Sequence, residues 1–227
     1  MDFFEAVSRR RSIRNYSDRP VPPDVVNRAI DAALLAPNSS NMQTWKIHWV
    51  RDEQKKRELA IACMNQGAAR TAQELLVFTA DSILWKKTRP FLLDSIKDNP
   101  RKDLHAYYGK LVPFLYGYRW LAPAKWLFVN VAGLFKPMVR DVVTSGDLRE
   151  VAVKSTALAC ENFMLAIAAQ GFDTCPMEGF DKVRVRKILN LSRRTAIVMV
   201  ISVGERTERG LWGERYRIPR SEVVFEV

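Results

Sequence analysis

Residues 147–170 read DLREVAVKSTALACENFMLAIAAQ, and Gly171 follows. This stretch predicts one long helix, because apolar residues recur along it without a proline and glycine commonly lies just beyond a helix end. Its apolar residues, among them Val151, Leu158 and Ile167, occupy more than one face. A helix that is apolar around much of its circumference is buried, either centrally or in a dimer interface. We therefore expect the fold to pack around this helix.

Shorter elements surround the long helix. Further helices are expected from a capping box at Asp2 and Glu5, from Pro22 to Pro37, and over residues 53–63 and 181–189; strands are expected over 46–50, 74–80, 195–203 and 223–227. The first helix is expected to direct Phe3, Phe4, Ala6 and Val7 towards the core. Because helices and strands mix without regular alternation, the sequence predicts one α+β domain over residues 1–227, with a mainly antiparallel sheet flanked by helices.

Composition limits the class of protein. The 227 residues are 48% hydrophobic, which excludes a disordered chain, and carry 36 Lys and Arg against 25 Asp and Glu. The net charge of +11 favours polyanions, anionic membranes or phosphorylated ligands as partners. Cys63, Cys160 and Cys175 form no CxxC pair, so we expect free thiols in a reducing compartment. The N-terminus does not resemble a signal peptide, and we expect a cytoplasmic protein.

Several common chemistries are excluded by the residues present. The two histidines, His48 and His105, are far apart and belong to no zinc motif, so no metal site is expected. His48 lies in an aromatic run that predicts a strand, and a structural role is its favoured interpretation. No two glycines stand two apart, which excludes a GxGxxG fingerprint, and there is no P-loop. Any nucleotide-like ligand is therefore bound without the usual glycine-rich loops.

Residues 82–140 differ from the rest of the chain. They contain 11 of the 36 Lys and Arg but only three acidic residues, and 11 of the 23 aromatic residues, Tyr118 included. We interpret this segment as a helical insert, basic and aromatic, within the single domain.

Four separated motifs carry the candidate chemistry. A basic cluster, Arg10-Arg11-Ser12-Ile13-Arg14, follows the first helix, and guanidinium groups bind phosphate oxygens bidentately. A polar loop from Pro37 to Trp45 offers amide and hydroxyl groups, and a turn at Pro176-Met177-Glu178-Gly179 lets a ligand approach the backbone. A late pair, Arg215 and Arg217, alternates as on one face of a strand. Each motif alone also has an ordinary structural interpretation, as a solvated face or a capped turn.

Together and in this order, the four motifs resemble the nitroreductase family of FMN-dependent NAD(P)H oxidoreductases. The resemblance spans nearly the whole chain, apart from residues 82–140. Thr44 stands where the family usually has proline, and Asn38 where it often has serine. The resemblance implies a homodimer that binds FMN, with the cofactor contacted by Arg10, Arg11, Ser12, Arg14, Asn38, Ser39, Asn41, Gln43, Asn65, Pro176, Met177, Glu178, Gly179, Arg215 and Arg217.

Within that set the resemblance implies distinct roles. Arg10, Ser12, Arg215 and Arg217 would hold the phosphate, and the loop residues 38–43 would come from the other subunit. Arg14 would lie near the flavin, where a cation favours the anionic reduced form. No catalytic side chain is expected, because the cofactor carries the hydride chemistry.

The implied activity is ping-pong transfer of electrons from NAD(P)H, through FMN, to a nitroaromatic, a quinone or a related small electrophile. Two alternatives remain: a specialised flavin dehydrogenase or dehalogenase of the same family, and a non-enzymatic polyanion binder suggested by the charge. We expect no nucleic-acid partner, since one segment and the phosphate-binding arginines explain most of the charge.

Two interpretations of residues 82–140 stay open. The favoured one is a lid whose rings pack over the flavin and shape the acceptor pocket. The other is a peripheral contact with an anionic membrane, at the inner membrane surface, because basic residues with interfacial aromatics are typical of helices that lie on such a surface. A lid that touches the membrane would satisfy both.

Overall fold

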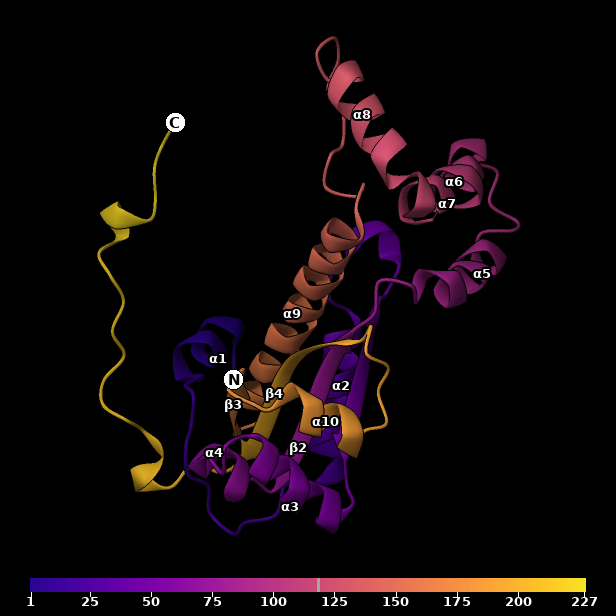
Figure 1. The fold of residues 1–227 in the computed structure, drawn as a ribbon. Coiled ribbons are helices and arrows are strands. Elements are labelled where there is room, and N and C mark those ends of the chain that lie inside the picture. The colour runs from indigo at the N-terminus through magenta and orange to yellow at the C-terminus, as the bar shows by residue number, and fades with distance from the viewer. Residues whose placement is uncertain (118) are drawn as a thin grey trace.

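A four-stranded antiparallel sheet lies at the centre of the computed structural model, which describes residues 1–117 and 119–227. The strand order is β1 (Trp45–Val50), β2 (Glu74–Ala80), β4 (Ala196–Gly204) and β3 (Asp173–Met177). Helices cover both faces of the sheet (Figure 1). The predicted α+β fold is therefore confirmed. Tyr118 lies outside the described residues.

Helices α9 (Ser145–Ala169) and α2 (Pro23–Leu34) pack on one face of the sheet. The β2 side chains Leu76 and Phe78 point towards them, and the Phe78 ring meets the Phe163 ring edge-on with centroids 5.5 Å apart. Among the described residues, α9 is the one helix long and apolar enough to span a bilayer. Because α9 packs against α2 and the sheet, it is a core helix, as its sequence predicts.

The opposite face is covered by α3 (Glu53–Ala62), α4 (Gly67–Arg70) and α10 (Lys182–Ile188). Leu75 and Val77 of β2 point to this side, so the strand alternates between two cores as a buried strand does.

His48 joins β1 to β2. Its Nε2 lies 3.2 Å from the Thr79 hydroxyl, and burial, with the Lys46 charge as a smaller cause, lowers the pKa of the imidazole. The structural interpretation of His48 fits this position.

The segment 82–140 is helical, as predicted. It contains α5 (Trp85–Ser95), α6 (Lys102–Ala106), a π-helical turn (Tyr107–Leu111), α7 (Val112–Tyr116), a short 3₁₀ turn (Arg119–Leu121) and α8 (Ala122–Ala132). Its base is held to the body by a small core of Trp85, Val112 and Tyr116 against Met42 and Leu148. Beyond that base α8 extends away from the sheet (Figure 1).

Three local predictions are wrong. The first helix, α1 (Phe3–Arg9), buries only Ala6, and Phe3, Phe4 and Val7 are exposed, because this short helix touches the body along one narrow side. Residues 223–227 form no strand, since nothing in the described chain pairs with them; only the 3₁₀ turns η4 (Glu208–Gly210) and η5 (Arg220–Glu222) follow β4. Arg215 and Arg217 likewise lie in irregular backbone. Residues 212–227 are all exposed, and the C-terminal end of the chain lies away from the body (Figure 1).

Candidate cofactor-binding site

The two ends of the chain meet in a basic pocket of about 320 Å³, here called the arginine cradle. Residues 10–14, just after α1, form one wall, and residues 212–217 form the other. The lining residues are Arg10, Arg11, Ser12, Arg14, Trp212, Glu214, Arg215, Tyr216 and Arg217. Six of the residues predicted from the sequence are thus brought together from positions some two hundred residues apart.

The first wall is fixed by its backbone to the edge strand of the sheet. Ser12 pairs with Thr174 of β3 in a parallel bridge, and the Ile13 N–H donates to the Thr174 carbonyl at 3.0 Å. Ile13 itself is fully buried, and the Arg14 N–H donates to the Gly210 carbonyl at 2.8 Å. A side chain at Gly210 would lie 2.7 Å from the Asn15 carbonyl oxygen, so the close approach of the two segments requires glycine there.

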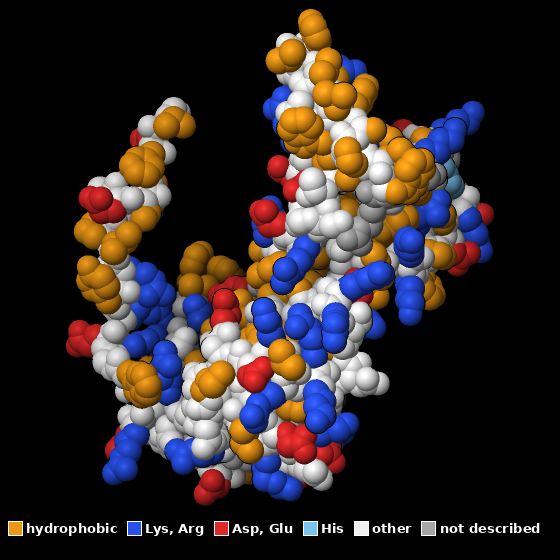
Figure 2. Space-filling model, in the orientation of Figure 1, with side chains coloured by type: hydrophobic (Ala, Val, Ile, Leu, Met, Phe, Trp, Pro, Cys, Tyr) orange, Lys and Arg blue, Asp and Glu red, His pale blue; other side chains and the backbone are white. Residues whose placement is uncertain are grey.

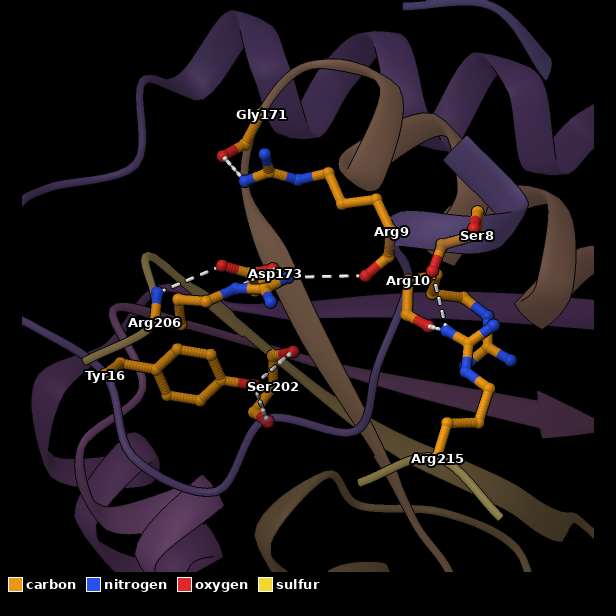
Figure 3. Close-up of polar contacts among 9 residues, drawn as sticks. All are labelled: Ser8, Arg9, Arg10, Tyr16, Gly171, Asp173, Ser202, Arg206 and Arg215. Atoms are coloured by element: carbon orange, nitrogen blue, oxygen red, sulfur yellow. Dashed lines mark hydrogen bonds and ion pairs between the residues drawn. The ribbon is translucent and has the colours of Figure 1, made fainter. Parts of the chain in front are cut away.

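A buried ion pair anchors this wall further (Figure 3). The Asp173 carboxylate is 2% exposed, and its Oδ2 accepts the Arg206 backbone N–H at 3.0 Å while its Oδ1 accepts from the Arg206 guanidinium. Arg206 also donates to the Arg9 carbonyl. Nearby, the Tyr16 hydroxyl lies 2.9 Å from that of Ser202, and burial raises the pKa of Tyr16 well above its usual value. These contacts position residues 9–16 rigidly.

The second wall is held by arginines of both segments. The Arg215 guanidinium donates to the Ser8 carbonyl at 2.8 Å and to the Arg10 carbonyl (Figure 3). In the other direction, Arg11 donates to the Gly213 carbonyl at 2.7 Å, and the Arg14 guanidinium lies 4.3 Å from the centre of the Trp212 ring. Trp212, which the sequence analysis missed, therefore positions Arg14 through a cation–π contact.

The cradle carries more positive than negative charge. Five guanidinium groups line it against one carboxylate, Glu214, and Arg10 pairs outside it with Glu161 at 3.2 Å. The pKa of Arg215 is lowered, first by burial and then by the neighbouring cations Arg11, Arg217 and Arg10. An anion placed among these groups would relieve the repulsion and find guanidinium donors with a serine hydroxyl, the donor set that a phosphate group requires.

The turn after β3 adjoins the cradle. Pro176 and Met177 end the strand, and the Gly179 carbonyl accepts from the Gln66 side chain at 2.8 Å. The backbone next to Gln66 is close to the first wall, because a side chain at Gly67 would lie 2.5 Å from the Arg14 carbonyl oxygen. Glu178 and Gly179, both exposed, thus form a rim that leads from the cradle.

Asn65 and the polar loop lie apart from the cradle. Asn65 has φ +53° and lines a separate hollow beside α3 and α4; its neighbour Gln66 makes the contact with the turn.

The loop containing Asn38, Ser39, Asn41 and Gln43, with the 3₁₀ turn η1 (Ser39–Asn41), packs on α9 and the insert. The Ser39 N–H donates to the Ser155 hydroxyl at 3.4 Å, and the Ser39 hydroxyl lies 2.6 Å from that of Tyr116. Ser155 of α9 is six residues from Glu161, the partner of Arg10, which corresponds to about 9 Å along the helix and roughly 240° around it. One chain therefore does not bring this loop to its own cradle.

Comparison with known proteins agrees with the fold. The model of the nitroreductase family matches residues 7–205. An NADH dehydrogenase of Thermus thermophilus is 29% identical over 226 residues, 99% of this chain and 96% of the relative. The Bacillus subtilis protein ydfN superposes with a TM-score of 0.80 at 24% identity, covering 99% and 98% of the two chains. An Exiguobacterium sibiricum protein solved in complex with FMN has a TM-score of 0.74 at 22% identity, covering 100% and 98%. The chain therefore belongs to the nitroreductase family.

Proposed function

We propose that this protein is an FMN-dependent oxidoreductase that passes electrons from NAD(P)H to a small aromatic or quinone-like acceptor. The observation that carries the proposal is the arginine cradle, in which both ends of the chain meet around a pocket suited to a phosphate group. The names of the relatives, an NADH dehydrogenase and a protein bound to FMN, support it.

In this proposal the cradle holds the FMN phosphate. Arg10, Ser12, Arg215 and Arg217 surround the pocket with charged donors and one hydroxyl, so the donor set fits the group. Bound there, FMN would supply the hydride and electron transfer that the side chains themselves cannot perform.

The flavin ring is expected to lie along the rim formed by the turn at 176–179. Arg14 is held by Trp212 at the junction of cradle and rim, where its fixed positive charge favours negative charge on a ligand. Arg11 donates a hydrogen bond to the Gly213 carbonyl, and we propose that it joins the two walls of the cradle in addition to any contact with the phosphate.

The complete site is proposed to need two subunits. The loop residues Asn38, Ser39, Asn41 and Gln43 do not line their own cradle, and we propose that they contribute to that of a second copy. The exposed apolar side chains of the C-terminal segment, Trp212 and Phe225 among them, are 75% and 73% exposed in the single chain and would be covered in a homodimer.

A second proposal concerns α8, for which we propose contact with an anionic membrane surface. Trp126, Phe128 and Phe135 are 57%, 56% and 86% exposed in and beside this helix. Hydrophobic side chains gather over the part of the molecule where α8 lies (Figure 2). From residue 104 to residue 140 the chain has no acidic residue, and Lys110, Lys136 and Arg140 are exposed, which gives the apolar patch a positive surround. Aromatic residues next to cations match a lipid interface with negative headgroups.

The base of the insert is proposed to act as the lid. Tyr107 and Tyr116 hydrogen bond to the hydroxyls of Ser40 and Ser39 in the loop proposed to reach the partner's cradle. Their rings therefore lie where an aromatic acceptor would approach, while α8 extends outward from them.

Vesicle co-sedimentation tests the membrane contact. The protein should pellet with vesicles rich in phosphatidylserine at low salt, less so at high salt, and W126A/F135A should pellet less. The control I61A removes an exposed side chain from α3 and should behave like the wild type. Failure to bind at low ionic strength would contradict the contact and leave the insert as a lid alone.

The visible spectrum of the purified protein tests the main proposal. A flavin absorption band that NADH or NADPH bleaches, and that a quinone or nitroaromatic restores, is the expected result. A colourless protein that does not take up added FMN would contradict it and favour the polyanion-binding alternative. A flavoprotein that oxidises neither nicotinamide would favour the specialised dehydrogenase alternative.

A further inference from the structure

A second basic hollow lies at the other end of the sheet. It has a volume of about 700 Å³ and opens where β2 ends and β4 begins, between the N-terminal turn of α9 and α10. Lys and Arg side chains gather over the face of the molecule shown in Figure 2, between the body and the insert. We call this site the distal hollow.

The distal hollow concentrates positive charge. The cations that line it are Lys86, Arg149, Lys182, Arg186, Arg193 and Arg194, and the one acidic lining residue is Asp81. Asp81 already accepts the Ile83 N–H at 3.1 Å in the turn before α5. The site therefore has at least five positive charges more than its own acidic residue can balance.

These cations lack carboxylate partners. Within residues 1–117 and 119–227, none of the six forms an ion pair, whereas Arg184 on the same helix pairs with Asp181 at 3.3 Å. Arg186 donates to the Thr195 carbonyl at 3.2 Å through Nη2, but its Nε is buried without an acceptor in the described structure. A buried donor without a partner is costly, so a shift of the Arg186 side chain towards an anion in the hollow would give Nε an acceptor.

The cluster is assembled by the fold and is not a run in the sequence. Lys182 and Arg186, four residues apart, share one face of α10, while Arg149 belongs to the start of α9 and Lys86 to the start of α5. The loop before β4 adds two adjacent arginines. Convergence of four elements distinguishes this site from an ordinary solvated charge run.

The distal hollow is separate from the arginine cradle. It lies at the Ala196 end of β4, whereas Arg206, which anchors the cradle, follows the Gly204 end. The nine residues of β4 span about 26 Å between these ends. The FMN phosphate proposed for the cradle therefore cannot satisfy the distal hollow.

We propose that the distal hollow binds a small, multiply charged phosphate anion, such as the diphosphate or triphosphate group of a nucleotide. Guanidinium and ammonium groups together bind phosphate oxygens, and a single phosphate would neutralise less than half of the charge present. A chain of two or three phosphates would contact cations from α10, α9 and the loop before β4 together.

Calorimetric titration with inorganic pyrophosphate, with FMN in excess, tests the proposal. Pyrophosphate should bind more tightly than orthophosphate, and its affinity should fall as salt increases. K182A/R194A should weaken pyrophosphate binding about tenfold or more, because it removes two charge-assisted contacts. The same variant should keep its FMN affinity, so failure at this site is distinguishable from failure at the cradle.

The matched control is R184A/K187A, which removes two cations from the same helix but outside the distal hollow. It should change pyrophosphate affinity by no more than about twofold, since it alters only the general field. Equal weakening in both double variants, equal affinity for orthophosphate and pyrophosphate, or no binding by the wild type at low salt would each overturn the proposal.

Discussion

Arg217 reaches the arginine cradle from the exposed C-terminal segment, and its described hydrogen bond is to the neighbouring Tyr216 carbonyl at 2.7 Å. Replacing it with alanine should raise the dissociation constant of FMN about 10- to 150-fold, because this is the loss that one charge-assisted hydrogen bond corresponds to. The thermal stability of the flavin-free protein should not change, because the side chain packs against little else. Quenching of FMN fluorescence measures the affinity.

The matched control is Arg220→Ala, three residues further along the same exposed segment and outside the cradle lining. It should bind FMN like the wild type. If Arg217→Ala keeps wild-type affinity as well, the phosphate is not held where we propose.

The cysteines give a residue-level prediction of pH dependence. Burial raises the pKa of Cys63 to about 12 and that of Cys160 to about 12. A thiol in the unfolded chain ionises near 8.5, so these two side chains favour the folded state below that pH and lose the contribution as pH rises through 9 and above.

Thiol labelling checks this expectation. Folded protein at pH 8.5 should react with iodoacetamide far more slowly than protein unfolded in guanidinium, and its unfolding midpoint should fall between pH 8 and pH 10. Rapid labelling of the native protein at Cys63 or Cys160 would show that these thiols are accessible, contrary to the structure.

The sequence was informative about which charged residues matter and less so about what positions them. The family resemblance implied Arg10, Ser12, Arg215 and Arg217 as a phosphate-binding set, and the structure brings these four residues to one pocket. Trp212 and Asp173 gave no such signal, since a tryptophan and a buried aspartate acquire their roles only from the residues that folding brings beside them.

At the scale of the elements, the N-terminus of α9 depends on a capping box. The Thr144 hydroxyl accepts the Asp147 N–H at 3.1 Å, and Asp147 accepts the Thr144 N–H at 2.8 Å. The latter bond is the main cause of the lowered pKa of Asp147. Thr144→Ala should destabilise the protein by about 1 kcal/mol, because it leaves a helix donor without its cap.

Chemical denaturation measures this loss, and Thr144→Ser, which keeps the hydroxyl, is the control. The serine variant should recover most of the stability. Equal destabilisation by both substitutions would mean that the methyl group, and not the cap, is what matters at this position.

Elements with their own local pattern were predictable, and those defined by a neighbour were not. Helix α9 and strands β2 and β4 carry long apolar runs, and their bounds agree with the predictions within about two residues. Strand β3 was missed because it has only five residues and contains Pro176, which suggests a turn. Proline is tolerated there because β3 is the edge strand of the sheet, and the bridge on its outer side is made at Thr174 and not at Pro176. The tail at 223–227 has strand-like composition but no strand to pair with.

At the scale of the whole molecule, we predict an obligate homodimer with its sites at the interface. Sedimentation velocity should give a single dimer species. Removing residues 211–227 should abolish flavin binding, because that segment carries Arg215 and Arg217 and exposes the apolar side chains we expect a partner to cover. The core around α9, formed by other residues, should stay folded.

Circular dichroism separates loss of the site from loss of the fold in this truncation. A monomer that retained flavin and oxidised NAD(P)H, whether full-length or truncated, would contradict the dimer proposal. Composition alone could not have assigned the dimer, because it does not say which apolar residues stay outside the core.

The junction between the two walls of the cradle has a consequence for biosynthesis. The Arg215 guanidinium donates to the Ser8 carbonyl, 207 residues earlier in the chain, so the acceptor is synthesised long before its donor. The sheet and α9 can form while the chain is still attached to the ribosome, but the cradle can close only after residues 212–217 have emerged. If the cradle holds FMN as we propose, a nascent chain stalled before residue 211 would have a folded core that cannot yet take up the cofactor.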